Sequence, residues 1–271
     1  MDRSTGLPAL LINRRLTRAL VCALVVAMAS VVASAPRPAG AFERARLVGC
    51  NAVADLIAGN SQAGQLITVI APTITSESAT LEFFVRQGGC LRLAAGPYPA
   101  LVGRNGLSMH HREGDDTTPT GLFSIQTTMY GVRPNPGVTY PYRRLVCGDW
   151  WDEQSSSPHY NRFVHVPCGT TPNFGGDSEA LWENVPSYDY FAVIQYNRSP
   201  TLAGLGSAIF LHVSDGLPTT GCVSIPGADL VRILRTLRTN LRPLIQITTR
   251  QRLDARVDSV RTAHLHDHAQ T

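Results

Sequence analysis

Two residues with the chemistry of a catalytic pair lie within the segment FLHVSDGLPTTGCVSIP, residues 210–226. His212 ends one apolar run, and Cys222 begins the next one ten positions later. A thiol becomes a nucleophile when a neighbouring group takes its proton, and a histidine with a near-neutral pKa is the usual partner. The pair predicts a cysteine nucleophile with an imidazole base. The alternative is a small buried cysteine beside a hydrogen-bonded histidine.

The elements around the pair must bring the thiol and the imidazole together. We expect residues 207–213 to form a strand, and residues 214–220 to be a hairpin-like connection that makes the following strand antiparallel. Gly221 lacks a Cβ, so it can adopt a positive φ and let a substrate carbonyl approach the backbone. Amides around Gly221 and Cys222 then predict an oxyanion site, with a hydroxyl from Thr219 or Thr220.

The N-terminus indicates export. Residues 1–18 carry four arginines, and residues 19–35 are almost wholly apolar, which is typical of a secretory signal. We expect residues 1–41 to be removed after Ala39-Gly40-Ala41; the alternative is an uncleaved anchor, for which the apolar run is short. With the signal cleaved, no integral membrane domain is expected. An exported chain enters an oxidising compartment, where structural cysteines pair.

The cysteine count leaves one thiol over. Of six cysteines, Cys22 lies in the signal core, so five remain in the mature chain. Cys147 and Cys168 flank one loop-rich segment, and Cys50 and Cys90 flank the first part of the mature chain. We expect those two bridges, although spacing alone does not fix connectivity. Cys222 is then the unpaired thiol.

Patterning predicts a mainly β fold with a few helices. Short apolar runs bounded by glycine, proline or asparagine predict strands at residues 66–71, 81–86, 90–94, 121–128, 162–166, 190–196, 207–213 and 243–249. Helices are expected at residues 43–59, 178–185 and 228–238. Many short strands with few helices favour a barrel or a sandwich. The polar segment 131–176 is expected to be a functional loop or lid.

Four segments of the sequence resemble the L,D-transpeptidase catalytic family of bacterial cell-wall enzymes. The core signature of that family is a histidine followed by Ser/Thr-x-Gly-Cys and an apolar residue, and here it reads His212, then Thr219-Thr220-Gly221-Cys222-Val223. Further likeness lies in REGDDTTPTGLFSI (112–125), GDWWDEQSSSPHYNRFV (148–164) and GSAIFLHV (206–213). Four pieces in the right order make the resemblance specific, and they cover roughly residues 95 to 248.

The resemblance implies an L,D-transpeptidase-like β-sandwich or barrel and a cell-envelope or secreted enzyme acting on peptidoglycan stem peptides. Cys222 would be the nucleophile and His212 the general base, with Gly221 and Thr220 at the oxyanion site. The donor would be a stem tetrapeptide, held on Cys222 as a thioester and passed to an amine or to water. No cofactor is implied, and we expect a monomer.

The resemblance also divides the chain and marks two departures. We expect an N-terminal helix and strands packed on the catalytic domain at 42–94, the catalytic domain at 95–249 and a polar tail, disordered or loosely helical, at 250–271. Many members carry a histidine before Gly-Cys, where this chain has Thr220, and an arginine two residues after the cysteine, where it has Ser224. Arg198, Arg104 or Arg112 are candidates to replace that arginine as a carboxylate clamp.

Other candidate residues lie in the polar loop and before it. Trp150, Trp151, Tyr160 and Asn161 are expected to line a substrate groove, the alternative being that they anchor the loop. His110 and His111 lie near Glu113, Asp115 and Asp116, but Asp-Asp-Thr-Thr-Pro favours a turn over a metal site, so we expect no metal. The net charge is only +4, without a basic stripe interleaved with aromatics, so we expect no nucleic-acid partner.

Two alternative functions stay open. A carboxypeptidase or endopeptidase would use the same cysteine chemistry and pass the acyl group to water. A non-catalytic cell-wall-binding module would keep the fold and not depend on Cys222. The residues do not decide between amine and water as the acceptor.

Overall fold

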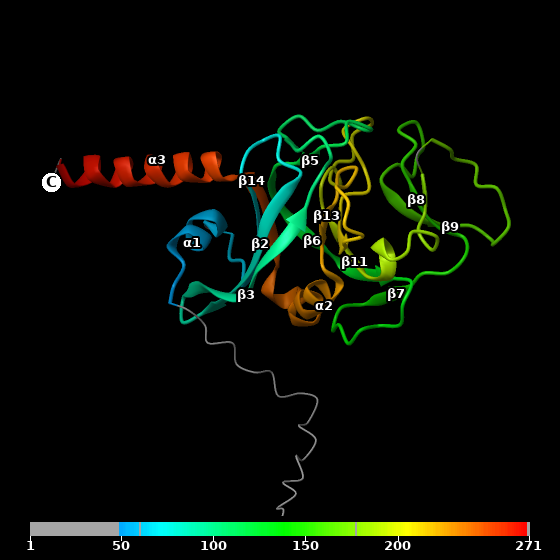
Figure 1. Ribbon diagram of the computed structural model, residues 1–271, viewed down its shortest axis with the longest axis horizontal. Coiled ribbons are helices and arrows are strands. Elements are labelled where there is room, and N and C mark those ends of the chain that lie inside the picture. Colours follow the sequence, from blue (N-terminus) through cyan, green and yellow to red (C-terminus); the bar gives the residue numbers. More distant parts are fainter. Residues whose placement is uncertain (1–48, 60, 177, 270–271) are drawn as a thin grey trace, which may run out of the picture. The chain divides into compact units, whose positions relative to one another are not determined.

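The structure, a computed structural model, describes residues 49–59, 61–176 and 178–269. The expected signal, its cleavage site, Cys22 and the first residues of the helix expected at 43–59 lie outside these ranges. Strands dominate the described residues (Figure 1), which confirms the mainly β fold class. The strands are β1 Gln65–Ala71, β2 Ser78–Gln87, β3 Cys90–Leu101, β4 Leu107–Ser108, β5 Thr118–Pro119, β6 Gly121–Gly131, β7 Tyr142–Arg144, β8 Asp149–Asp152, β9 Arg162–His165, β10 Glu179–Ala180, β11 Phe191–Ile194, β12 Phe210–Val213, β13 Val223–Ile225 and β14 Leu244–Thr249.

The main sheet closes on itself as a barrel. Its strands follow the order β11-β12-β13-β3-β2-β1-β14-β6-β7, and β11 also pairs with β6. Small sheets are formed by β10-β8-β9 and by β4-β5. Alternating apolar residues of the barrel strands fill its interior, among them Val69, Leu81 and Leu211, each fully buried. The closed sheet gives β12 and β13, which carry the His212–Cys222 segment, hydrogen-bonded neighbours on both sides.

The segment expected to pack on the catalytic domain is part of the same sheet. β1 pairs in parallel with β14 and antiparallel with β2. The boundary expected between residues 94 and 95 falls inside β3, which runs unbroken from Cys90 to Leu101. Residues from both sides of that boundary therefore share one hydrogen-bonded barrel.

The hairpin expected between the strands of His212 and Cys222 is wrong. β12 and β13 are parallel, with Leu211 opposite Val223 and His212 opposite Ser224. The connection returns along residues 102–104: the amide of Thr219 donates to the carbonyl of Val102 at 2.9 Å, and the amide of Arg104 donates to the carbonyl of Thr219 at 2.8 Å. This pairing carries the chain back to the start of β12, so the next strand runs in the same direction.

The helices partly follow the sequence pattern. α1 spans Ala52–Ala58 and begins where the side chain of Asn51 accepts the amide of Ala54 at 2.8 Å. α2 spans Gly227–Thr236 and confirms the helix expected there, with Leu230, Ile233 and Leu234 buried against the barrel. Short 3-10 turns lie at Ser187–Asp189 and Thr239–Leu241.

Two segments differ from the expected helical assignments. The helix expected at residues 178–185 is wrong: Glu179 and Ala180 pair with Trp151 and Trp150 as β10, so pairing across the small sheet overrides the local helical pattern. Residues 250–271 were expected to be disordered or loosely helical. The structure forms α3 from Arg250–Ala269, anchored at its first turn by the buried Leu253.

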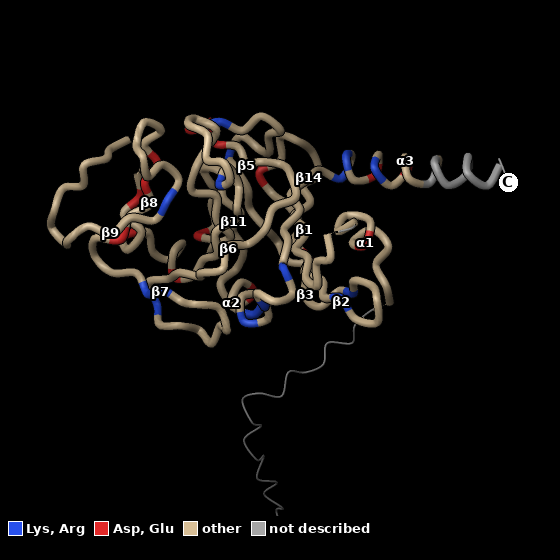
Figure 2. Tube along the Cα trace, turned by 180° about the vertical axis from the view of Figure 1, so that it is seen from behind, with Lys and Arg blue, Asp and Glu red and all other residues tan. Residues whose placement is uncertain are grey.

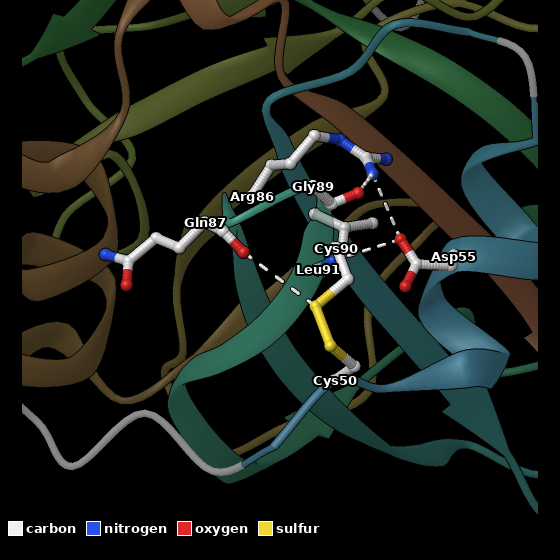
Figure 3. Close-up of a disulfide and its surroundings, with 7 residues drawn as sticks. All are labelled: Cys50, Asp55, Arg86, Gln87, Gly89, Cys90 and Leu91. Atoms are coloured by element: carbon white, nitrogen blue, oxygen red, sulfur yellow. Dashed lines mark hydrogen bonds and ion pairs between the residues drawn. A yellow bond between two sulfur atoms is a disulfide. The ribbon is translucent and has the colours of Figure 1, made fainter.

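Both expected disulfides are present. Cys147 and Cys168 are bridged, and so are Cys50 and Cys90. Figure 3 shows the second bridge between the chain before α1 and the first residue of β3, next to Asp55. The carboxylate of Asp55 accepts from Arg86 at 3.1 Å and from the amide of Leu91 at 3.0 Å, which fastens α1 to β2 and β3. Cys222 is the free cysteine of the described residues, and it is buried.

Charges are distributed unevenly over the described residues. Figure 2 shows acidic positions beside β5 and along β8, whereas basic positions mark α2.

Within the described residues, no group of three or more histidine, cysteine or acidic residues is arranged to hold a metal ion. None of the described helices has both the length and the apolar character that a membrane crossing requires.

Candidate active site

The thiol of Cys222 lies just before β13 and is held by the neighbouring strand β12 and the residues leading into it. Its sulfur lies 3.1 Å from the carbonyl oxygen of Ala208, to which the thiol donates, and it accepts the amide of Phe210 at 3.3 Å. Only 7% of the residue is exposed. The sulfur is therefore fixed by two backbone groups rather than by the imidazole in this state.

His212 lies on β12, and its hydrogen bond defines its tautomer. Its Nδ1 lies 2.8 Å from the carbonyl oxygen of Val213, so Nδ1 carries the hydrogen and Nε2 is left as the basic nitrogen. The Tyr188 ring packs against the imidazole at nearly a right angle, with 5.8 Å between the ring centroids. His212 and Cys222 both line one cavity of about 170 Å³.

Burial keeps both members of the pair uncharged at rest. Burial raises the pKa of the Cys222 thiol well above its ordinary value, and the nearby Glu179 carboxylate raises it further. Burial also lowers the pKa of His212. A neutral thiol and a neutral imidazole suit general-base chemistry, in which the proton moves as the sulfur attacks.

The oxyanion side of the site differs from the expectation. Gly221 has a φ of 149°, a conformation that favours glycine. Its amide, however, donates to the hydroxyl of Thr219 at 3.2 Å, and that hydroxyl donates to the carbonyl of Cys222 at 2.7 Å. Thr219 thus shapes the turn. Thr220, by contrast, is exposed and lines both of the cavities that Cys222 lines.

Asn161 and Trp151 were expected to line a substrate groove, but their side chains are buried, with 2% and 0% of the residue exposed. Asn161 Oδ1 accepts Trp151 Nε1 at 3.1 Å and the amide of Ala208 at 3.2 Å. Because Ala208 in turn accepts the Cys222 thiol, Asn161 supports the nucleophile from behind. The Tyr-Asn pair looked like an exposed loop feature because sequence alone does not reveal this burial.

Tyr160 and Arg198 line a different hollow, of about 490 Å³, and not the cavities around Cys222. Arg198 Nη1 donates to the carbonyl of Asn161, and its guanidinium lies 5.1 Å from the centre of the Trp151 ring. Of the three arginines considered as a clamp, Arg104 is the one that lines a cavity with Cys222. Arg104 Nε lies 3.3 Å from the carboxylate of Asp116.

The polar loop is anchored around a buried carboxylate. Asp149 is fully buried and accepts from Arg143 at 2.6 Å, and its oxygen lies 2.6 Å from Nδ1 of His165. Trp150 packs edge-on against Trp182 at 5.3 Å between ring centroids. These contacts, with the nearby Cys147–Cys168 bridge, match the alternative that this loop is anchored structurally.

A group of residues that the sequence did not single out as catalytic lines a second cavity at Cys222. This cavity, of about 370 Å³, is lined by His111, Glu113, Glu153, Glu179 and Ser207 among others. In the sequence, His111 and Glu113 suggest only a metal site or a turn. Residues 111 and 222 are too far apart in the chain for any local pattern to bring them together. The sequence feature that could have pointed to these residues is the GDDTTPTG segment. It lies beside the cysteine, because Thr118 Oγ1 donates to the carbonyl of Cys222 at 3.1 Å.

Comparison with known protein families identifies a catalytic domain. The YkuD family, described as the L,D-transpeptidase catalytic domain, matches residues 74–247, which is more than half of the chain. A search of curated proteins finds no match, and neither does a search of solved structures. The matched range contains the barrel strands from β2 to β13 and β14 as far as Ile247, and it holds both Cys222 and His212. The chain therefore belongs to the L,D-transpeptidase catalytic domain family.

Proposed function

We propose that this protein is an exported cysteine acyltransferase that acts on peptidoglycan stem peptides through a thioester on Cys222. Family membership makes it an L,D-transpeptidase-type enzyme in general. The observation that carries the specific proposal is the free Cys222 thiol, which shares a cavity with the basic Nε2 of His212. A reduced thiol that shares a cavity with an imidazole, among described cysteines that are otherwise bridged, is the arrangement expected of a nucleophile.

The reaction begins when a stem peptide carbonyl reaches the sulfur. Nε2 of His212 takes the thiol proton as the sulfur attacks, which avoids a free thiolate in a buried site. Thr220 lines both cavities that Cys222 lines, and its hydroxyl is our candidate for stabilising the tetrahedral oxyanion. The imidazolium then returns the proton to the departing amine. The acyl group remains on Cys222 as a thioester.

Export is supported by two independent features. The described residues hold two disulfides, which form and persist in oxidising compartments. The basic, then apolar, N-terminal sequence is that of a secretory signal. We propose the bacterial cell envelope, or the medium outside it, as the place of action, with a monomer as the acting form.

Covalent capture tests the proposal directly. A carbapenem, which acylates active-site nucleophiles, should add its mass once per chain, and peptide mapping should place the adduct on Cys222. Cys222→Ala should form no adduct. His212→Gln should form it at least about a hundredfold more slowly, which is the low end of the range for losing a general base. An unlabelled wild-type protein with intact disulfides and a freely titrating thiol would rule out this function.

The acceptor separates the transferase from a hydrolase. Incubation with a stem tetrapeptide and a D-amino acid should give an exchange product that contains the added amino acid. Release of tripeptide alone would assign the chain to carboxypeptidase chemistry. Cell-wall binding that is unaffected in Cys222→Ala, with no turnover in the wild type, would assign it to a binding module.

A further inference from the structure

The hollow beside Arg198 is lined by cations and hydroxyl groups, and it is separate from the cavities at Cys222. Its volume is about 490 Å³, and none of its lining residues lines either of those two cavities. Arg162 and Arg198 both contribute to its wall. The hydroxyl-bearing residues of the wall are Tyr160, Ser155, Ser157, Ser199 and Thr201. None of the described residues that line the hollow is acidic.

Contacts with two buried residues hold the guanidinium of Arg198 in place. Its Nη1 donates to the carbonyl of Asn161, and its central carbon lies 5.1 Å from the centre of the Trp151 ring. Both Asn161 and Trp151 are buried, so they form a firm support. A guanidinium has five N–H donors, and the side chain of Arg198 makes no other hydrogen bond with the described residues. Its remaining donors are therefore held ready for a ligand.

The second arginine of the hollow places another positive charge close to the first. Arg162 is the exposed first residue of β9, and no carboxylate of the described residues pairs with it. Burial lowers the pKa of Arg198, and the charge of Arg162 lowers it further. Two like charges that lie close together without a counter-ion repel each other, and an anion bound to both would remove that repulsion.

The carboxylates nearest to this wall already have other partners. The hydroxyl of Ser157 donates to Asp152, and the hydroxyl of Tyr160 donates to Glu113. Asp152 is fully buried and also accepts the amide of Gln154 at 3.0 Å. Neither Asp152 nor Glu113 lines the hollow. The charge that would balance the two arginines is therefore left for a ligand.

We propose that this hollow binds a phosphate group, which the guanidiniums of Arg162 and Arg198 hold between them. Planar guanidiniums bind phosphate oxygens through paired hydrogen bonds. A phosphate monoester carries a charge of about −1.5 to −2 at neutral pH, which balances two arginines better than the single charge of a carboxylate does. The exposed Ser199 adds a hydroxyl donor to the same wall. This site is distinct from the thiol chemistry of Cys222 and does not depend on the acyltransferase function.

Isothermal titration calorimetry of the full chain with inorganic phosphate at pH 7.5 tests the proposal. The wild type should bind one phosphate per chain. Arg162→Gln should weaken binding at least about tenfold, the low end for losing a charge-assisted hydrogen bond, and Arg162→Lys should fall between the two. The matched control is Arg232→Gln, an exposed arginine of α2 outside the hollow, which should keep the wild-type Kd. No binding by the wild type, or equal Kd values in Arg162→Gln and Arg232→Gln, would overturn the proposal.

Two further ligands, titrated into the wild type at matched ionic strength, identify the chemistry of the site. Acetate should bind at least about tenfold more weakly than phosphate, because it carries one charge and two oxygens. Equal binding of acetate and phosphate would overturn the assignment to phosphate. Glucose 6-phosphate that binds more tightly than inorganic phosphate would show that the site takes a phosphate carried on a sugar, whereas equal or weaker binding would assign the site to the free ion. Both of these results support a phosphate site.

Discussion

The Ala208 carbonyl accepts the thiol of Cys222, and the Ala208 amide donates to the buried side chain of Asn161. One residue therefore links the nucleophile to the polar loop that carries Asn161. Ala208 itself has a φ of 51°, an uncommon conformation for a residue with a side chain. Asn161 holds this conformation in place, and the position of the sulfur depends on it.

Removal of the Asn161 side chain should therefore weaken the fold and misplace the thiol. Asn161→Ala leaves Trp151 Nε1 and the Ala208 amide without an acceptor, so we expect a loss of about 3 kcal/mol in unfolding free energy. Urea unfolding measures this loss, and carbapenem acylation should slow in the protein that remains folded. The matched control is Gln62→Ala, because Gln62 has the same φ of 58° as Asn161 but is exposed. Equal losses in the two variants would show that backbone strain alone is responsible.

Glu179 should set the pH range in which Cys222 reacts. Burial raises the pKa of Glu179 to about 7, and its charge above that pH raises the pKa of the thiol. Glu179→Gln should therefore speed alkylation of Cys222 by iodoacetamide above pH 7 severalfold, with little effect below pH 6. The exposed neighbour variant Glu183→Gln should follow the wild-type profile. A Glu179→Gln profile identical to that of the wild type would show that the carboxylate does not act on the sulfur.

The same glutamate should make stability depend on pH in a defined direction. Its folded-state pKa of about 7 lies above the ordinary 4.5, so the folded state binds the proton more tightly than the unfolded state. Its contribution to stability is full below about pH 4.5 and is lost as the pH rises through 7. Compared with the wild type, Glu179→Gln should gain stability between pH 5 and pH 8 in denaturant titrations. A constant difference over that range would contradict the raised pKa.

Gly206 should be intolerant of a side chain because of the His111 ring. Gly206→Ala should cost about 1–3 kcal/mol more than Gly204→Ala, since a Cβ at 204 meets nothing within 4 Å. Both glycines have positive φ, 95° and 72°, so the backbone strain is matched and the difference reports the contact with the imidazole. Thermal or urea unfolding of the two variants measures it. Equal costs would mean that the ring moves aside freely.

The bridge between Cys147 and Cys168 should matter for the site as well as for stability. Replacing both cysteines with serine opens a loop with a sequence separation of 21, which predicts a loss of about 3 kcal/mol. The bridge flanks β8 and β9, which hold Trp151 against Asn161, so carbapenem acylation should slow too. The serine pair at Cys50 and Cys90 should cost similar stability but leave the acylation rate of the folded protein unchanged. Slower acylation in the Cys50/Cys90 serine pair, with an unchanged rate in the Cys147/Cys168 pair, would show that the loop does not position the nucleophile.

The features that depend on residues close together in the sequence could be predicted from it. The periodicity of residues 228–238 predicted α2, and the odd cysteine count identified Cys222 as the free thiol. The parallel pairing of β12 and β13 could not be predicted, because it depends on Thr219 pairing with residues 102–104 far away in the sequence. His111 was missed for the same reason. Asn161 and Trp151 were misplaced because a polar loop sequence does not reveal that its segment folds back over a buried acid, Asp149.

The link between Cys50 and Cys90 has a mechanical consequence. Tension applied to the chain upstream of Cys50 passes through the two sulfur atoms into the first residue of β3, and α1 is spared (Figure 3). β3 is hydrogen-bonded to β2 along most of its length, so the pull reaches a strand that many backbone hydrogen bonds hold in the barrel. Under force applied from that end, the bridged protein should therefore keep α1 folded at forces that would unfold this helix if the bridge were absent.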